Sequence, residues 1–285
     1  MKKVLVIVMS MNSKEFSEEE EVIRQTWASD IISGKFPGMK VLFYKGKEKR
    51  KEHLNGDVLY IDSDDTLNGT YEKTVKTLEW CMKNEEFDFI VKTNTTTYIN
   101  TGLLSDFIER LPDGDRHIYG STYITNTCSN GILYFRGNFA IWSKNVVSDI
   151  IKTYNKRKCV DDGGIGRNLC LYYKKEKIDY YSRMREVDGA KLYDNFPVVK
   201  YSYDKMKSCI WFRLKSGTPG KDHGFLIDKM RSLHAYIKTE ERPFIPQETF
   251  NENSIAEIHP KRYTLTLEEA IKFSKKHESS TVLYR

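Results

Sequence analysis

A run of polar residues directly follows an apolar segment in "FDFIVKTNTTTYIN" (87–100). The first part of this stretch is mostly apolar and β-prone, and it predicts a buried strand. Asn94, Thr95 and Thr96 follow, and no residue after Lys92 carries a charge. The carboxyl end of a buried strand is where α/β proteins place ligand chemistry. The sequence therefore predicts a ligand-binding strand end made of amide and hydroxyl groups, without a carboxylate.

The bulk composition limits the class of protein. The chain has 285 residues, of which 39% are hydrophobic and 13% aromatic, so it has the material for a sizeable core and is not a disordered chain. The formal net charge is +6, from 46 basic and 40 acidic residues. This spread-out excess suits an anionic small ligand. It argues against nucleic acid as a partner, because the densest basic run, "YKGKEKRKEH" (44–53), has the composition of a solvated loop.

The cysteines and the amino-terminal residues indicate a cytoplasmic setting. The five cysteines are widely spaced and form no CxxC, which indicates neither a zinc site nor a disulfide framework and fits a reducing compartment. The apolar run from Val4 to Met9 is shorter than the about 20 residues of a membrane span or the about 7–15 of a signal peptide. We expect it to be the first buried strand, and we expect no membrane anchor.

The predicted elements of the first half follow a β-α-β-β-α-β order, which implies a mostly parallel sheet with helices on both faces. Ser17 is the candidate N-cap of the first helix. The second half predicts antiparallel strands, then a helix, a loop running into a helix, a loop-rich aromatic stretch after residue 190 and a last helix. Strands are expected in 2–10, 39–46, 57–65, 87–93, 117–125 and 131–143, and helices in 17–27, 70–84, 101–111, 144–154, the later part of 160–175, and 266–277.

Six segments within residues 1 to about 172 carry a family resemblance. In order they are "VIRQTW" (22–27), "LFYKG" (42–46), "GDVLYIDSDDTLNGTYEKTVKTLEW" (56–80), "FIVKTNTTTYIN" (89–100), "FRGNFAIWSKNVVSDI" (135–150) and "VDDGGIGRNL" (160–169). Each is weak alone, but the ordered set resembles the β-1,3-glycosyltransferases of the fringe and galactosyltransferase superfamily. The resemblance implies an α/β GT-A fold with a Rossmann-like sheet, a nucleotide-sugar donor and an inverting reaction.

On this resemblance we expect one GT-A domain over residues 1–285. Residues 1–112 would form the nucleotide-sugar-binding half and 113–240 the acceptor and catalytic half, with a smaller antiparallel region. Residues 241–285 would be a C-terminal extension.

The family's three consecutive acids, which hold a divalent metal against the donor phosphates, align with Asn94, Thr95 and Thr96. Neutral amide and hydroxyl groups are poor sole ligands for a hard dication. We therefore expect no metal and no cofactor besides the nucleotide-sugar substrate. Asp62 and Asp64 form a literal Asp-x-Asp, but they align with the end of the preceding strand, where acids commonly cap the next helix. With Asp65 they are the alternative ligand set.

Basic side chains are expected to replace the metal. Metal-independent GT-A enzymes such as the core-2 branching type neutralise the diphosphate with Arg and Lys. Arg213 and Lys215 are two residues apart in "CIWFRLKSGTPGKDHG" (209–224), so on an extended segment they point to the same face. They would offer phosphate a planar fork and a point charge. The alternative is a basic edge strand facing solvent.

Further cations are expected nearer the nucleotide by analogy with the family. Arg24 lies in the Ile-Arg-x-Thr-Trp-like motif, where the alternative is an ion pair with an acid. Lys73 and Lys92 complete the donor-binding set, and the reserve candidates are Lys221, His223 and Arg231.

The acidic pair Asp161–Asp162 supplies the candidate base. An inverting transfer needs a carboxylate that removes the proton of the acceptor hydroxyl, and the resemblance assigns this role to the second acid, Asp162. The glycines of "DDGGIG" (161–166) would let the backbone approach a sugar closely. The alternative is that Asp162 caps a helix beginning near Ile165. Both readings can hold together.

Tyr134, Phe139 and Trp142 are candidates for stacking on acceptor sugars, although aromatic residues in strands are more often core.

Three functions compete. The first is an inverting, metal-independent glycosyltransferase acting on a UDP-sugar and a glycan acceptor, and the second is a non-catalytic sugar- or nucleotide-binding protein of the same fold. The third is a nucleic-acid binder, which predicts a steep salt dependence. Asp162, Arg213 and Lys215 favour the first, in a bacterial or virus-encoded cytoplasmic enzyme. UDP-galactose, UDP-GlcNAc, UDP-glucose and UDP-xylose stay open as donors.

Overall fold

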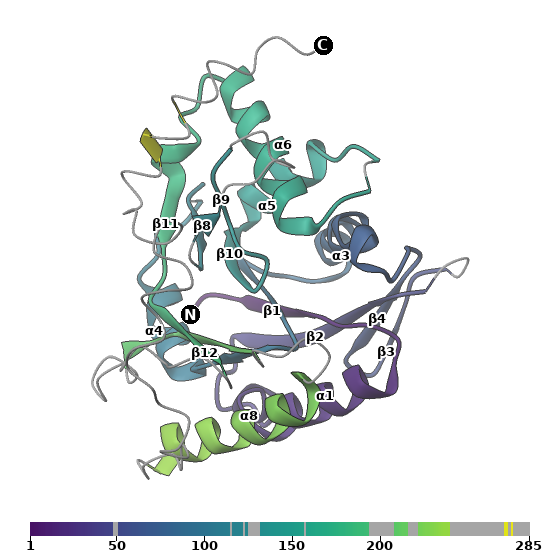
Figure 1. Cartoon of the computed structure of the whole chain (residues 1–285). Helices are drawn as coiled ribbons and strands as arrows, with labels where there is room; N and C mark the ends of the chain where they lie inside the picture. Colours follow the sequence, from purple (N-terminus) through teal and green to yellow (C-terminus); the bar gives the residue numbers. More distant parts are fainter. Residues whose placement is uncertain are drawn as a thin grey trace, which may run out of the picture.

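A large mixed sheet forms the centre of the computed structural model (Figure 1). The described residues are 1–47, 51–114, 116–121, 123–124, 132–156, 158–193, 208–215, 222–239, 271–272 and 275. Within them the sheet has eight strands in the order β11-β7-β10-β5-β1-β2-β4-β3. These are β1 Val4–Met9, β2 Met39–Gly46, β3 His53–Asn55, β4 Val58–Ile61, β5 Phe89–Asn94, β7 Ile118–Gly120, β10 Phe139–Ser143 and β11 Met184–Glu186.

The middle of this sheet is parallel. β1 pairs in parallel with both β2 and β5, and β2 does so with β4, whereas β10 runs antiparallel to β5 and β7. The continuous apolar run of β1 explains its central position, because a strand covered on both faces needs apolar side chains on both. The predicted α/β class, with a Rossmann-like, mostly parallel sheet, is confirmed.

Helices cover both faces, and two cores result (Figure 1). Side chains alternate along β1, so Val4, Val6 and Val8 enter one core while Leu5 and Ile7 enter the other. The first core lies under α1 Lys14–Gln25, α2 Ser29–Ile32, α4 Thr101–Glu109 and α8 Asp222–Thr239, and the second under α3 Thr70–Asn84, α5 Lys144–Lys152 and α6 Asp161–Lys175. Among the helices of the described ranges, none combines the length and apolar character that a membrane span requires.

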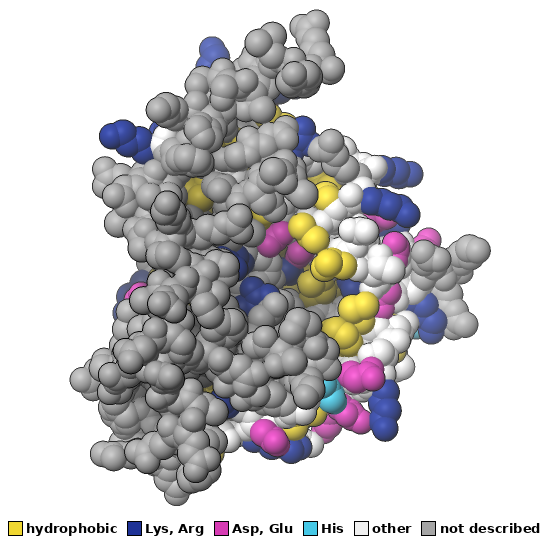
Figure 2. All heavy atoms as spheres, viewed as in Figure 1, with side chains coloured by type: hydrophobic (Ala, Val, Ile, Leu, Met, Phe, Trp, Pro, Cys, Tyr) yellow, Lys and Arg dark blue, Asp and Glu magenta, His cyan; other side chains and the backbone are white. Residues whose placement is uncertain are grey.

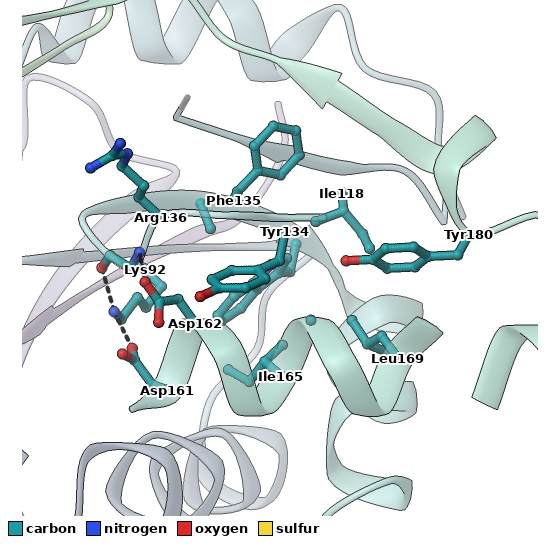
Figure 3. Close-up of a pocket in the computed structure, with 14 residues that line it drawn as sticks. Lys92, Ile118, Tyr134, Phe135, Arg136, Asp161, Asp162, Ile165, Leu169 and Tyr180 are labelled. Atoms are coloured by element: carbon teal, nitrogen blue, oxygen red, sulfur yellow. Dashed lines mark hydrogen bonds and ion pairs between the residues drawn. The ribbon is translucent and has the colours of Figure 1, made fainter. Parts of the chain in front are cut away.

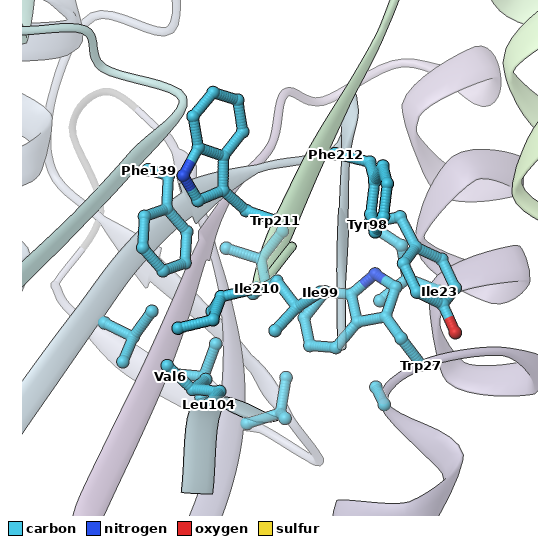
Figure 4. Close-up of a cluster of buried hydrophobic side chains, with 14 of the residues drawn as sticks. Val6, Ile23, Trp27, Tyr98, Ile99, Leu104, Phe139, Ile210, Trp211 and Phe212 are labelled. Carbon is cyan, nitrogen blue, oxygen red and sulfur yellow. The ribbon is translucent and has the colours of Figure 1, made fainter. Parts of the chain in front are cut away.

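A second, three-stranded sheet joins the first core. It has the order β12-β13-β6, with β12 Gly189–Tyr193, β13 Trp211–Lys215 and β6 Thr97–Ile99. The Trp211 ring stacks on Phe139 with a centroid distance of 6.1 Å, and Phe212 meets Tyr98 edge to face (Figure 4). Because the strand order is β12-β13-β6, β13 is the middle strand of this sheet. The alternative of a basic edge strand is therefore wrong. The remaining short elements are β8 Tyr123–Ile124, β9 Tyr134–Phe135, η1 Leu67–Gly69 and η3 Tyr181–Arg183.

Helix boundaries agree with the sequence pattern in places and differ in others. The helix predicted over 70–84 is confirmed as α3. α1 begins three residues before Ser17, because Ser13 is its N-cap and accepts a hydrogen bond from the Phe16 amide. The last predicted helix, 266–277, lies outside the described residues except for 271–272 and 275.

Helix α8 was not predicted from the sequence. Its buried residues Leu226, Met230 and Leu233 have helical spacing. This signal was available in a stretch that composition alone marked as loop-rich.

The prediction of a loop at 160–164 is wrong, because α6 already begins at Asp161. Its glycines let the helix approach other parts of the protein rather than a sugar. A Cβ built on Gly164 would lie 2.8 Å from the Tyr71 ring, and one on Gly166 would lie 2.3 Å from the Tyr134 Cβ. Glycine at these positions therefore allows close packing of α6 against α3 and β9.

Gly166→Ala tests this close packing. An alanine inside a helix normally stabilises it relative to glycine, but the overlap with Tyr134 should lower the free energy of unfolding by about 1–3 kcal/mol. Gly102→Ala in α4 is the matched control, because the atom nearest to its Cβ is 3.7 Å away. That change should raise the free energy of unfolding by about 0.4–1 kcal/mol. Urea titration of both variants measures the two effects, and a stabilised Gly166→Ala would contradict the packing argument.

Candidate active site

The candidate site lies where parallel strands end at one edge of the main sheet. From β1 the chain passes through α1 on one face to β2, and it returns from β4 through α3 on the other face to β5. The carboxyl ends of β1 and β5 therefore lie side by side, with Met9 opposite Asn94. Open α/β sheets bind ligands at such a reversal of strand order. The structure thus places the polar strand end of β5 where a ligand is expected.

The Asn94 side chain closes the turn at this strand end. Its Oδ1 accepts hydrogen bonds from the Thr96 amide at 3.2 Å, the Thr96 hydroxyl at 2.8 Å and the Thr97 hydroxyl at 3.1 Å. The Thr95 side chain is buried. An amide oxygen with three donors and a buried hydroxyl do not fit a divalent cation, which requires several outward-facing oxygens. The residues at positions 94–96 therefore do not form a metal site of the family's kind.

A turn at residues 136–138 crosses the end of β5. The Asn138 carbonyl accepts a hydrogen bond from the Thr93 hydroxyl at 2.8 Å. The Thr97 hydroxyl lies 3.1 Å from this carbonyl and shares its single proton between it and Asn94 Oδ1. The Gly137 carbonyl accepts one from the Lys92 ammonium, and the Gly137 amide donates to Asp162 at 3.0 Å (Figure 3). This turn thus joins the strand end to the start of α6.

The two acids of α6 occupy different environments. Asp161 is buried and forms an ion pair with Lys92, whose side chain is also buried. Asp162 is partly exposed, and its two oxygens accept hydrogen bonds from the Gly163 and Gly137 amides at 2.7 and 3.0 Å. It does not cap the helix, because Val160 occupies the N-cap position. Of the two carboxylates, Asp162 is the more exposed.

Burial raises the pKa of the Asp162 carboxyl above its ordinary value, and the negative charge of Asp161 raises it further. Lys92 and the two backbone amides act in the opposite direction, but the pKa stays raised. A carboxylate with a raised pKa is a stronger base than an exposed aspartate. Its surroundings therefore suit proton abstraction.

A small cavity of about 30 Å³ borders Asp162, and Arg136 contributes to its wall. Sequence reasoning missed Arg136, although its position directly before Gly137 in "FRG" was a signal. In Figure 3 the Arg136 side chain extends away from the ribbon on one side, while Asp162 lies on the other, near Asp161 and Lys92. The cavity is lined by Lys92, Ile118, Tyr134, Phe135, Arg136, Gly137, Ala140, Trp142, Asp161, Asp162, Ile165, Gly166, Leu169 and Tyr180.

A larger cleft of about 470 Å³ lies beyond the ends of β1, β2 and β4. The Asp65 carboxylate organises it by accepting hydrogen bonds from the Asn12 amide at 2.7 Å and the Gly46 amide at 2.8 Å. The buried Lys73 ammonium lies 2.6 Å from Asp65 and also donates to the Ser10 carbonyl. Burial lowers the pKa of Lys73. Asp65 and Lys73 thus fix the loops around the cleft.

The space-filling view shows how this side of the molecule is built (Figure 2). Acidic and basic side chains gather near the middle of the face, next to a band of hydrophobic side chains. A polar ligand with an apolar part suits such a surface.

The structure places Arg24 away from this strand end. Its guanidinium forms two hydrogen bonds to Asp57, at 2.7 and 2.9 Å, and lies over the Phe43 ring. Asp57 precedes the first residue of β4, whereas the candidate site lies at the strands' other ends. Arg24 therefore joins α1 to the sheet, which is the ion-pair alternative considered for it.

The structure does bring Arg213 to the strand end. The register of β13 with β6 pairs Arg213 with Thr97, and the Leu214 amide donates to the Thr96 carbonyl at 2.8 Å. Lys215 is the last residue of the same strand. Among the reserve candidates, His223 lies between Glu18 and Glu19, Arg231 is exposed on α8, and Lys221 lies outside the described residues.

The aromatic candidates for acceptor binding are buried. Tyr134, Phe139 and Trp142 expose at most 4% of their surface. Phe139 belongs to one core, while Trp142 faces the other across the sheet. In this arrangement they are core residues, which is the alternative considered for them. Tyr134 and Trp142 also line the small cavity beside Asp162.

Comparison with known proteins gives the family. Residues 18–174, more than half of the chain, match the sequence model described as Galactosyltransferase. The chain belongs to the galactosyltransferase family. The recognition made from the six ordered segments is therefore confirmed, and this galactosyltransferase-family protein is a glycosyltransferase. No curated protein sequence matches it.

Solved structures of glycosyltransferases resemble this family member only distantly. One is the glycosyltransferase involved in glycosylation of the major capsid of PBCV-1, with 10% identity, coverage of 80% of this chain and 98% of that chain, and a TM-score of 0.45. Another is the galactosyltransferase LgtC in complex with donor and acceptor sugar analogs, with 9% identity, coverage of 85% and 98%, and a TM-score of 0.44. A third is the mannosyltransferase PcManGT from Pyrobaculum calidifontis in complex with GDP-Man and Mn²⁺, with 10% identity, coverage of 100% and 76%, and a TM-score of 0.41.

Asp65→Asn tests the framework of the larger cleft. The change leaves the buried Lys73 ammonium without its counter-charge and should lower the free energy of unfolding by about 3 kcal/mol, the low end for a broken buried pair because Asp65 is partly exposed. Lys73→Met in the same chain should recover part of this loss. A double-mutant cycle in urea measures the coupling, and additive effects would show that the pair does not act as a unit.

Proposed function

We propose that this member of the galactosyltransferase family is an inverting, metal-independent enzyme that transfers a sugar from a UDP-sugar to a hydroxyl of a glycan acceptor, with Asp162 as the base. The observation that carries the proposal is the placement of Asp162. Its carboxylate is partly exposed, is held by two backbone amides and has a raised pKa. The turn at residues 136–138 connects it to the end of β5, where residues 94–96 hold no carboxylate.

The proposed step is a single displacement. A carboxylate oxygen of Asp162 takes the proton of the acceptor hydroxyl while the hydroxyl oxygen forms a bond to the anomeric carbon. The bond from that carbon to the diphosphate oxygen breaks, and its electron pair leaves with the nucleoside diphosphate. Attack from the face opposite the leaving group inverts the anomeric centre. Because Asp162 removes a proton and forms no bond to the sugar, one carboxylate suffices.

Fixed cations would stabilise the leaving diphosphate in place of a metal. Arg213 is the best-placed candidate, because its strand is hydrogen-bonded to the 94–97 segment, and Arg136 adds a cation on the turn beside Asp162. Lys215, at the end of the same strand as Arg213, is the next candidate for this role. The cleft around Asn12 and Asp65 has room for the nucleoside. Lys73 and Lys92 are engaged in buried ion pairs and would act on the donor only indirectly.

We also propose a cytoplasmic location. The five cysteines are widely spaced along the sequence and form no CxxC, which indicates neither a zinc site nor a disulfide framework. This cysteine usage suits a reducing compartment.

Metal removal is the first test. Donor binding and transfer should be the same in EDTA and in added Mn²⁺, because residues 94–96 present no carboxylate to a cation. A thermal-shift screen of nucleotide-sugars in both buffers identifies the donor, since ligand binding raises apparent stability. Transfer is then assayed with that donor. An absolute need for Mn²⁺ would contradict the proposal and point to Asp62, Asp64 and Asp65.

Asp162→Asn is the second test. It preserves size and removes the base, so kcat should fall by about 10²–10⁴-fold, while donor affinity measured by calorimetry should not change. The activity of the wild-type enzyme should fall as the pH drops through the raised pKa of Asp162, because only the ionised carboxylate accepts a proton. Full activity of Asp162→Asn would overturn the assignment. A wild-type chain that binds donor and transfers no sugar would favour the non-catalytic alternative.

A further inference from the structure

The Lys92 side chain is an unusual feature of the site, because it is a cation buried beneath it. Its side chain is only 1% exposed, so it cannot meet a donor phosphate directly in this arrangement. Its ammonium forms an ion pair with Asp161 and donates a hydrogen bond to the Gly137 carbonyl. A buried charge is stable only when its partners are held in good geometry. Lys92 therefore restrains both Asp161 and Gly137.

Gly137 passes this restraint to Asp162. Its carbonyl faces Lys92, while its amide donates to the Asp162 carboxylate at 3.0 Å. A Cβ built on Gly137 would lie 3.0 Å from Asp161 Oδ1 and 3.1 Å from Lys92 Nζ. A side chain at this position would push against the ion pair. The absence of one lets the turn lie directly on Lys92 and Asp161 (Figure 3).

We propose that Lys92 and Asp161 are positioning residues that hold the Gly137 turn, and through it the Asp162 carboxylate, in the orientation needed for proton abstraction. This inference rests on the proposed function of Asp162. It gives Lys92 and Asp161 a role distinct from contact with the donor or with the reacting atoms. Asp161, as the first acid of the pair, serves to neutralise the cation that supports the second.

Electrostatics provides a signature that packing alone would not. Asp161 raises the pKa of Asp162, and Lys92 lowers it. The other ionisable side chains that line the same cavity are Arg136, Tyr134 and Tyr180. Removing either member of the ion pair should therefore shift the pKa of Asp162, and the two shifts should have opposite signs. A residue that only filled space would leave this pKa unchanged.

The experiment compares Lys92→Met, Asp161→Asn and the double variant with the wild-type chain. The pKa of Asp162 is measured by NMR of ¹³C-labelled aspartate carboxyls, with the Asp162→Asn spectrum as the assignment. We expect Lys92→Met to raise this pKa, Asp161→Asn to lower it, and the double variant to lie between them. If Lys92→Met does not fold, Asp161→Asn and the double variant still test the positioning role, because the double variant leaves no unpaired buried charge.

The same variants are assayed for transfer over a range of pH. With donor and acceptor saturating, Lys92→Met should lower kcat by about 100-fold, the size expected when a reacting group is misplaced by about 1 Å. The acid limb of its pH profile should move in the direction of the pKa measured by NMR. Donor affinity should not change, because Lys92 does not touch the donor.

Lys45→Met is the matched control. Lys45 is also buried and pairs with Glu20 at 2.9 Å, but it lies on β2 and is not among the residues that line the Asp162 cavity. The Lys45→Met variant should have a lower free energy of unfolding in urea titration, as Lys92→Met should, but its Asp162 pKa should equal that of the wild-type chain.

Two results separate the possible failures. If neither Lys92→Met nor Asp161→Asn moves the pKa of Asp162, or if both move it in the same direction, the positioning role is overturned even when Asp162→Asn is inactive. If the wild-type chain transfers no sugar, the proposed function fails, while the NMR titration still reports whether the ion pair controls this carboxylate.

Discussion

The contact of the Lys92 ammonium with Asp161 and Gly137 is the interaction on which the rest of the site depends. An ammonium group taken out of water needs an opposite charge and further hydrogen-bond acceptors. In this protein the opposite charge comes from α6 and the acceptor from the turn before β10. β5, α6 and the turn therefore have a fixed relation to one another, and the carboxylate of Asp162 is placed by that relation.

The same device recurs along the carboxyl edge of the sheet. Lys73 is buried against Asp65, which joins the loops after β1, β2 and β4, and Lys45 is buried against Glu20, which joins β2 to α1. Parallel strands that end at one edge leave loops with no regular hydrogen-bond ladder. These loops lie outside the apolar cores, so side-chain packing does not fix them. Buried lysine–carboxylate pairs hold them in place instead. The sheet end that carries the candidate site is thus organised by charge rather than by apolar contact.

The strand end of β5 shows how an acid-free sequence keeps the shape of the site. Asn94 closes the turn with three hydrogen bonds, and Thr93 and Thr97 fasten the Asn138 carbonyl. Each of these groups is neutral, so their packing creates no charge repulsion that a cation would have to relieve. In the proposed mechanism the positive charge for an anionic donor comes from side chains outside this segment, and the pairing of β13 with β6 brings Arg213 to the same strand end.

Sequence reasoning was reliable where the signal was local. The apolar runs and turn residues predicted β1, β2, β4, β5 and the longer helices of the first half, because burial on two faces and helical periodicity leave direct traces in the residue order. The short elements α2, β3 and β6 were not predicted. Ordered motifs gave the family and the Asp161–Asp162 pair. α8, by contrast, was missed despite its apolar spacing, and the start of α6 was misplaced because its glycines suggested a loop. Those glycines meet Tyr71 and Tyr134, residues distant in sequence.

By itself, then, the sequence determined the α/β class, the position of the polar strand end, the lack of acids at 94–96 and the identity of the candidate base. Only the tertiary structure decided which charges are available to a ligand. In the sequence, Lys92 and Arg24 are both basic residues in family-like motifs. In the structure both form ion pairs with acids, Lys92 beneath the site and Arg24 at the start of β4. The residue type determines the charge of a side chain, whereas the strands and helices that the fold brings together determine its ion-pair partner.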